Sequence, residues 1–358
     1  MIVKDRCLDI YHALLASRLP MKLLGIEFAP FLLPLKRRFQ TFCMFIWFMQ
    51  FLLLGPTIVI ITTYLLFTKY YWITILLYSW TWYDRQTPQR GGRRSDYFRS
   101  LSVFKGLADY FPMRLHKSED LDPSKNYVAG FHPHGIFAVG AFTNFASEAT
   151  GFKKLFPGIR SSLLTLRGQF FFPIYRDYIM LSGACDVSKE SVNYLLNDQG
   201  KGNMVVIVVG GAIEMLEAHP DQYTVHLKTR KGFIKKALET GSQLVPIYSF
   251  GETDMFNQVP NPKGSKLRWL QTKLKVVNGY PLTPFYGRGI FNYTFGIVPH
   301  RKSINTVVGK PIDVEKTENP SQEAIDSLHD VYCKALQTLF DDYKTKFGIS
   351  ENKYLAVN

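Results

Sequence analysis

An uncharged, apolar stretch near the start of the chain constrains the fold more than any other feature. No charged residue lies between Thr41 and Thr68, and after Lys69 a second apolar and aromatic run extends from Tyr70 to Tyr83. Crossing the hydrocarbon core of a bilayer takes about 20 apolar residues, so there is length here for two membrane helices. Gly55-Pro56 is either a kink in the first helix or the bend of a re-entrant hairpin. We therefore predict a membrane hairpin at residues 41–83.

Basic residues flank this stretch on both sides. Three precede it and four follow it: Lys36, Arg37, Arg38, Arg85, Arg90, Arg93 and Arg94. Because Lys and Arg are enriched in cytoplasmic flanks, both ends are expected in the cytosol, which requires two crossings or a hairpin that does not cross. Residues 1–40 are expected to form a cytosolic segment. Its apolar residues Leu8, Tyr11, Leu14 and Leu15 fit either an amphipathic stretch on the bilayer surface or an ordinary tail.

Residues 84–358 have the composition of one mixed globular domain. Short β-branched runs at residues 203–209, 244–250 and 304–308 alternate with helical patterns, which predicts an α/β sheet covered by helices. The last predicted helix begins after Asn319 as its cap and Pro320 in its first turn. Apolar residues follow at helical spacing and indicate a face packed in the core: Ile325, Leu328, Tyr332, Leu336, Leu339 and Tyr343.

The chain is strongly basic, with a net charge of +14. Such a charge favours an acidic partner, which can be nucleic acid, an anionic membrane surface or a phosphate-bearing ligand. No nucleic-acid-binding signature is present, so the last two are preferred. The four cysteines are scattered and form no Cys-x-x-Cys pair, which indicates neither a zinc site nor a disulfide framework: Cys7, Cys43, Cys185 and Cys333.

Two histidines follow a short apolar run that ends at Phe131. They belong to the sequence His132-Pro133-His134-Gly135. Alternate residues of an extended segment project to the same side, and proline restricts the backbone, so the two imidazoles are expected close together. Histidine is the side chain best suited to accept a proton near neutral pH. A structural pair and a metal site are the other interpretations of this spacing.

Two further groups of residues suit a catalytic site. The predicted strand at 203–209 runs into Gly210-Gly211 and then Glu214, at a strand end where α/β folds place their sites. Glu214 is either a partner of a histidine or a surface carboxylate in a first helical turn. Arg230-Lys231-Gly232 opens another predicted helix that ends near Gly241. Cations at a helix start favour phosphate binding, and Gly232 suggests a close approach to the backbone.

In this order, these motifs make the chain resemble the diacylglycerol O-acyltransferase type 2 family, which includes the monoacylglycerol and wax alcohol acyltransferases. The resemblance covers nearly the whole chain, through Tyr110-Phe111-Pro112, Phe131 with the two histidines, Phe156-Pro157-Gly158, Gly210-Gly211-Ala212 with Glu214, Arg230-Lys231-Gly232-Phe233, Phe250-Gly251-Glu252 and Thr306-Val307-Val308-Gly309. Pro260-Asn261-Pro262 and Phe291 to Gly296 are most similar to the monoacylglycerol branch, whereas Asp342 to Ser350 is equally similar to the wax alcohol branch. The acceptor therefore stays open at this point.

The resemblance implies a glycerolipid-acyltransferase-like mixed sheet with flanking helices, preceded by the membrane hairpin. It implies an O-acyltransferase of the endoplasmic reticulum membrane, with lipid droplets as a second location and self-association or hetero-association as further expectations. Acyl-CoA is expected as the co-substrate, with no bound cofactor, and monoacylglycerol is the expected acceptor. His134, or else His132, is expected to act as the general base. Arg230 and Lys231 are expected to bind the nucleotide phosphates.

One departure concerns the partner of the base. Related glycerolipid acyltransferases have an aspartate five residues after the catalytic histidine, where this chain has Phe137 after His132 and Val139 after His134. Glu214 is therefore predicted to orient the imidazole, and backbone N–H groups near Gly135 or Gly210-Gly211 to face the oxyanion. No Gly-x-Ser-x-Gly elbow is present, so direct transfer is expected rather than an acyl-enzyme.

Two interpretations of another class remain. A metal-dependent membrane hydrolase built on His132 and His134 needs a third ligand, and none is evident in the sequence. A membrane-tethered lipid-transfer or scaffolding protein needs no base at all.

Overall fold

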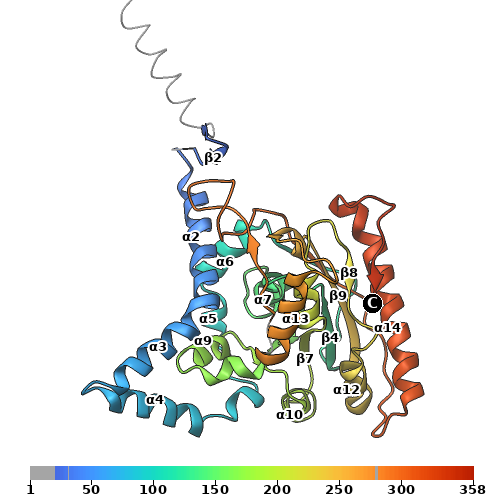
Figure 1. Cartoon of the computed structure of the whole chain (residues 1–358). Coiled ribbons are helices and arrows are strands. Elements are labelled where there is room, and N and C mark those ends of the chain that lie inside the picture. Colours follow the sequence, from blue (N-terminus) through green and yellow to red (C-terminus); the bar gives the residue numbers. More distant parts are fainter. Residues whose placement is uncertain (1–20, 31, 279–280) are drawn as a thin grey trace, which may run out of the picture.

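The computed structural model describes residues 21–30, 32–278 and 281–358, so the amphipathic pattern at Leu8 to Leu15 lies outside the described residues. The N-terminal apolar stretch forms one continuous helical segment, Leu35–Leu66, which is long and apolar enough to cross a membrane. It consists of α2 (Leu35–Met49), a π-helical turn (Gln50–Leu54) and α3 (Gly55–Leu66). Gly55-Pro56 does not end the helix. The wider π-helical turn lies just before this proline, which lacks an N–H, and α3 diverges from the axis of α2 in Figure 1.

A second, shorter helix, α4 (Tyr71–Tyr83), follows a turn and packs against α3. The Thr74 hydroxyl donates to the carbonyl of Thr62 over 2.9 Å. The chain therefore reverses at residues 67–70. It does not reverse at Gly55-Pro56, where one of the two interpretations placed the bend of a hairpin. With 13 residues α4 is about 20 Å long, less than the roughly 30 Å hydrocarbon core. Two full crossings by this pair are not shown, and its insertion as a hairpin stays a prediction.

A mixed sheet of seven strands forms the centre of the remaining chain (Figure 1). Its order is β3 (Arg114–Lys117), β12 (Asn305–Val308), β9 (Gln243–Phe250), β4 (Tyr127–His132), β7 (Asn203–Val208), β5 (Arg160–Thr165) and β6 (Cys185–Asp186). Only the β12–β9 pair is antiparallel. The predicted strands at 203–209, 244–250 and 304–308 are confirmed. Because β4, β7 and β9 run parallel, the segments that follow β4 and β7 meet at one edge of the sheet.

The other elements are short strands and helices around this sheet. The short strands are β1 (Met21–Leu23), β2 (Ile26–Phe28), β8 (Thr224–Val225), β10 (Asn257–Gln258), β11 (Phe285–Tyr286) and β13 (Ala356–Val357). The helices are α5 (Asp96–Arg99), α6 (Ser102–Tyr110), α7 (Val139–Phe145), α8 (Phe152–Leu155), α9 (Tyr175–Leu181), α10 (Lys189–Asn193), α11 (Gly211–Leu216), α12 (Gly232–Thr240), α13 (Lys266–Asn278) and α14 (Gln322–Lys344).

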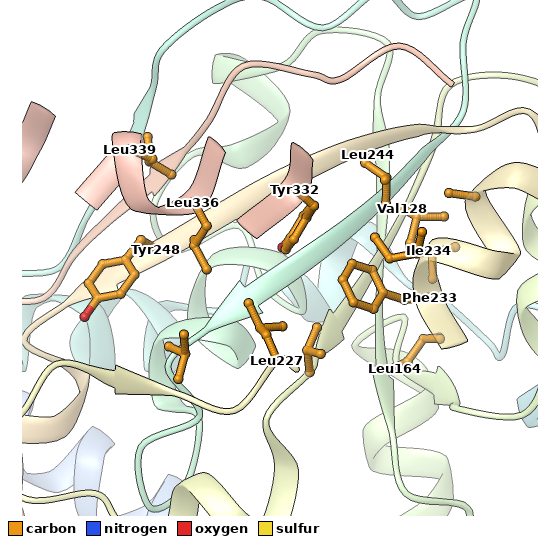
Figure 2. Packing of buried hydrophobic residues seen from close by; sticks show 14 of the residues in the cluster. Val128, Leu164, Leu227, Phe233, Ile234, Leu244, Tyr248, Tyr332, Leu336 and Leu339 are labelled. Atoms are coloured by element: carbon orange, nitrogen blue, oxygen red, sulfur yellow. The ribbon is translucent and has the colours of Figure 1, made fainter. Parts of the chain in front are cut away.

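Both faces of the central strands are buried. Val128, Val205 and Leu244 pack toward α12 and α14, whereas their neighbours Ala129 and Val206 pack on the opposite side. This two-sided burial explains why the strands read as continuous apolar runs. Figure 2 shows Tyr332, Leu336 and Leu339 of α14 over the sheet, with Phe233 and Ile234 of α12 beside them. The predicted core face of the last helix is confirmed at these positions.

The start of α14 differs from the prediction. Ser321 is its cap, and the hydroxyl of Ser321 accepts a hydrogen bond from the N–H of Ala324 over 3.2 Å. The helix therefore begins two residues after the predicted position at Pro320. A hydroxyl that satisfies an otherwise free N–H stabilises a helix start, and serine does this as well as asparagine.

The long apolar segment is fixed to the sheet domain. α2 packs along α6, and its residues Met44, Trp47 and Phe48 join the same cluster as Phe104 and Leu107. After α4, the carboxylate of Asp84 pairs with the fully buried guanidinium of Arg176 over 2.7 Å. Both ends of the segment 35–84 are thus attached to the domain that carries the histidines.

Candidate active site

His132 ends strand β4 and is fully buried. Its Nε2 lies 3.0 Å from the hydroxyl of Tyr332 on α14, and that hydroxyl donates to the carbonyl of Gly130 over 3.1 Å. A hydroxyl has one proton, so Nε2–H of His132 must donate to Tyr332. Burial lowers the pKa of His132 to about 3. His132 is therefore neutral, with its proton on Nε2 and directed into the core.

His134, two residues later, is partly exposed and lines an apolar cavity. Its Nδ1 lies 3.1 Å from the carbonyl oxygen of Gly135. A carbonyl only accepts hydrogen bonds, so in the neutral ring the proton is on Nδ1 and Nε2 keeps its lone pair. Burial lowers the pKa of His134, partly offset by its backbone hydrogen bonds. Between the two histidines, the geometry favours His134 as the base.

Glu214, on α11, is the predicted partner of the base, and the structure corrects how it acts. Its Oε2 accepts the backbone N–H of His134 over 2.7 Å, and its Oε1 accepts the backbone N–H of His226 over 2.7 Å. Glu214 thus holds the main chain under His134, whereas the Gly135 carbonyl sets the tautomer of the ring. Burial raises the pKa of Glu214 to about 7, against the two N–H groups and the charge of Arg230, which lower it.

Gly210 makes room for this carboxylate. A Cβ atom at position 210 would lie 1.7 Å from Cδ of Glu214. Gly211 is different, because no atom lies within 4 Å of its Cβ position, its φ is +57° and it lines the cavity beside His134. Gly211 therefore leaves room for a ligand beside its backbone, on the surface of the cavity.

A second buried carboxylate, Glu252, supports the other side of the histidine loop. Its two oxygens accept the N–H of Gly140, each over 3.1 Å, at the start of α7. Gly135, with a φ of +59°, packs against Glu252, and a Cβ there would lie 3.0 Å from Cγ of Glu252. Burial raises the pKa of Glu252 to about 7. Sequence reasoning assigned Glu252 no role, although it appeared in the motif Phe250-Gly251-Glu252.

The predicted phosphate-binding residues lie at the start of α12 but differ from one another. Arg230 is half-buried, and its Nε has no hydrogen-bond partner among the described residues. Lys231 instead pairs with Asp326 of α14, Nζ to Oδ1 over 2.7 Å. Gly232 is exposed and no atom lies within 4 Å of its Cβ position. The structure thus brings Arg230 toward Glu214 and places Lys231 in an ion pair.

An apolar cavity of about 620 Å³ extends from His134 to the long apolar helix. Trp47, Phe51 and Gly55 of that helix form one wall. His134, Gly211 and Ala212 lie on the cavity surface, and most other lining side chains are apolar, among them Leu163, Leu166, Phe172, Tyr178, Ile207 and Phe285. Such a site suits a ligand with a long apolar part and one reactive polar group.

Among the residues that the structure describes, no group of three or more His, Cys, Asp and Glu side chains is arranged to hold a metal ion.

Pro133 joins His132 to His134 through a cis peptide bond after His132. The predicted residues His134, Glu214, Gly210 and Gly211 thus lie together at one edge of the sheet, while His132 faces the core behind them.

Comparison with protein families gives a match to Diacylglycerol acyltransferase over residues 63–358. The chain belongs to this family. As a diacylglycerol acyltransferase family member it is an acyltransferase, and the mixed α/β sheet domain carries its histidine motif.

Curated relatives of the diacylglycerol acyltransferase family match nearly the whole chain. Human 2-acylglycerol O-acyltransferase 1 is 47% identical over 332 residues, which cover 93% of this chain and 99% of that protein. Diacylglycerol O-acyltransferase 2 of Danio rerio is 47% identical over 311 residues, 87% of this chain and 86% of that protein. Among solved structures, a 1-acyl-sn-glycerophosphate acyltransferase from Thermotoga maritima is similar over 85% of this chain and 97% of its own, with 11% identity and a TM-score of 0.36.

Proposed function

We propose that this acyltransferase transfers an acyl group from acyl-CoA to monoacylglycerol and so makes diacylglycerol. The observation that carries the proposal is the apolar cavity that ends at His134 and extends to the helix Leu35–Leu66. Its size and lining suit an acyl chain or a lipid acceptor. The relatives named 2-acylglycerol O-acyltransferase, matched over almost their full length, favour this acceptor.

In this mechanism Nε2 of His134 accepts the proton of the acceptor hydroxyl while the oxygen attacks the thioester carbon. The new C–O bond forms, the C–S bond breaks, and the coenzyme A thiolate leaves with the proton that His134 has taken. The Gly135 carbonyl keeps the other ring proton on Nδ1, so Nε2 is available from the start. Glu214 keeps the backbone of His134 in place. Gly211, open to the cavity, is the best-placed residue to offer a backbone N–H to the oxyanion.

Arg230 supplies the charge for the phosphates of acyl-CoA. Its guanidinium has an unused buried donor and lies close enough to Glu214 to lower the pKa of that carboxyl. Guanidinium groups bind phosphate oxygens strongly, because charged donors meet charged acceptors in a fixed geometry. Lys231 contributes less, since Asp326 already neutralises it.

The enzyme is further proposed to sit in the endoplasmic reticulum membrane, with residues 1–40 and the catalytic domain 84–358 on the cytosolic side and residues 41–83 inserted. Support comes from the large apolar side chains that α3, α4 and the turn between them leave exposed: Val59, Ile60, Ile61, Tyr64, Leu66, Phe67, Tyr70, Tyr71, Trp72, Ile75, Leu76, Tyr78, Trp80, Trp82 and Tyr83. Soluble surfaces rarely gather so many. Lipid droplets and an oligomeric state belong to the same proposal.

The test is an assay of membranes that express wild-type, His134→Ala or His300→Ala protein. His300 is not among the residues that line the cavity, and its Nε2 lies 3.2 Å from Nδ2 of Asn257. Labelled acyl-CoA is supplied with monoacylglycerol, diacylglycerol or a long-chain alcohol. We expect labelled diacylglycerol as the main product, its loss in His134→Ala, and its retention in His300→Ala. Triacylglycerol as the main product would favour the second candidate acceptor, which the relatives named diacylglycerol O-acyltransferase 2 support; a wax ester would favour the alcohol acceptor. Transfer to no acceptor would overturn the proposal.

A further inference from the structure

The loop of residues 223–230 connects the two charged residues of the site. It begins with β8 and ends just before α12. The N–H of His226 is the second donor to Glu214, over 2.7 Å. Arg230 lies four residues further on. Whatever fixes this loop therefore fixes both the carboxylate under His134 and the guanidinium assigned to the acyl-CoA phosphates.

A distant segment, Ala356–Asn358, holds this loop through its backbone. β13 pairs in parallel with β8, Ala356 opposite Thr224 and Val357 opposite Val225. The N–H of Ala356 donates to the carbonyl of Tyr223 over 2.9 Å, and the N–H of Asn358 donates to that of Val225 over 2.8 Å. These two bonds lie directly before His226 in the chain.

The same segment also binds the part of the loop that follows His226. The backbone oxygen of Asn358 accepts the N–H of Leu227 over 2.8 Å and that of Lys228 over 2.9 Å. The carbonyl of Leu227 in turn accepts the N–H of Arg230 over 2.8 Å, and it lies 2.9 Å from Nε2 of the buried His329 on α14. Leu227 is fully buried, and Figure 2 shows its side chain among the residues beneath α14.

α14 in turn holds the residues around Ala356–Asn358 in place. Nζ of Lys344 donates to the carbonyl of Lys353 over 2.9 Å, and Leu355 is buried in the main core. The side chain of Ala356 is exposed, so its contribution comes from its backbone. A chain of contacts therefore runs from α14 through residues 353–358 to the loop, then to Glu214 and the backbone of His134.

We propose that Ala356–Asn358 is a positioning segment for catalysis: it fixes the loop 223–230, and through the His226 N–H it sets the place of Glu214 and hence of His134. The part that concerns turnover rests on the proposed function, whereas the part that concerns the loop does not.

The first arm of the test measures hydrogen exchange by mass spectrometry on the purified full chain. Ala356→Pro removes the N–H that donates to Tyr223, and Ala356→Ser keeps it at the same exposed position. In Ala356→Pro we expect peptides that contain His226 and His134 to exchange about ten-fold faster, because local opening exposes their amides. Peptides from β12 and α6 should not change. Unchanged exchange at His226, or faster exchange throughout the protein, overturns the proposal.

The second arm measures acyl transfer. Ala356→Pro is expected to lower kcat about ten-fold, since a small displacement of the base is costly, while Ala356→Ser keeps the wild-type value. In a Glu214→Gln background the same proline should lower kcat less than about two-fold, because both changes act on one contact chain. Multiplicative losses would show that the segment does not act through Glu214. If wild-type protein transfers nothing, the proposed function fails, and the exchange arm alone still decides the role of the loop.

Discussion

Glu214 binds the backbone of His134 rather than its ring, with Oε2 only 2.7 Å from the N–H. The carboxylate therefore fixes the position of the His134 backbone that carries the imidazole, and the Gly135 carbonyl fixes the tautomer of the ring. This division of work explains how the chain manages without an acidic residue five positions after either histidine.

Replacing Glu214 by glutamine should lower kcat by about 10²-fold, because the amide accepts only one of the two N–H groups and the base is displaced. Stability should fall by about 1–3 kcal/mol, the cost of a buried N–H without a partner. Glu190→Gln, at an exposed position in the first turn of α10, is the control. Steady-state kinetics and thermal unfolding measure both effects, and wild-type kcat in Glu214→Gln would contradict this role.

Gly210→Ala should lower kcat and stability in a similar way, because it displaces the Glu214 side chain. Its Cβ would lie 1.7 Å from Cδ of Glu214, so the carboxylate must move, at a cost of about 1–3 kcal/mol. Gly232→Ala adds a methyl group in open space and should leave stability within about 0.5 kcal/mol. A raised KM for acyl-CoA in Gly232→Ala would indicate that the co-substrate approaches that backbone; an unchanged value would remove Gly232 from the site.

The pH dependence of kcat should show an acid limb below the ordinary imidazole value of about 6.5. Burial disfavours the cation and lowers the pKa of His134, so the ring stays neutral, and able to accept a proton, to a lower pH than a free histidine. Burial raises the pKa of Glu214 to about 7, so the acid limbs of the wild type and of Glu214→Gln are compared to separate its titration from that of His134. Initial rates from pH 4.5 to 8 suffice, and a limb at or above 6.5 would argue against His134.

Arg230→Ala should raise KM for acyl-CoA about ten-fold or more, with a smaller effect on kcat, because a charge-assisted bond to phosphate contributes about 1.5–3 kcal/mol. Lys231→Ala, next in sequence, should change KM less than about three-fold, since its ammonium already pairs with Asp326. KM is also compared between acyl-CoA and acyl-dephospho-CoA as substrates. Equal effects of the two substitutions would mean that the ion pair opens when acyl-CoA binds.

Phe172→Ala should shift the preference toward longer acyl chains, because its ring lines the cavity next to Gly55. Each additional buried methylene contributes about 0.8 kcal/mol, which is roughly a four-fold change in kcat/KM. Phe171→Ala removes a neighbouring ring that is exposed and should leave the preference unchanged. Competition between acyl-CoA species of different length measures the shift, and an equal shift in both variants would place the acyl chain elsewhere.

Patterns within single elements could be predicted from the sequence, and contacts between distant elements could not. The β-branched runs predicted β7, β9 and β12, and helical spacing predicted the core face of α14. Gly241, with a φ of +64°, ends α12 as expected from a glycine after a helical pattern. These predictions succeed because burial on one or both faces determines which residue types occur there.

The candidate site shows the limit more clearly. That Glu214 lies near His134 followed from their places at strand ends, but whether it contacts ring or backbone depends on a loop conformation that spacing does not encode. The ion pair that occupies Lys231 comes from Asp326 on α14, 95 residues away in sequence. The sequence left open whether the chain bends at Gly55-Pro56 or kinks there and continues, because a proline is compatible with both; the π-helical turn before it lets the helix continue to Leu66.

The hydrogen bond between His132 and Tyr332 joins residues 200 positions apart. During synthesis the apolar helices and β4 leave the ribosome long before α14 exists, and the segment that precedes the base lacks its partner until then. The site can be completed only after most of the chain has been translated. A nascent or prematurely terminated polypeptide that lacks α14 would therefore present the histidine motif without the framework that holds it in place.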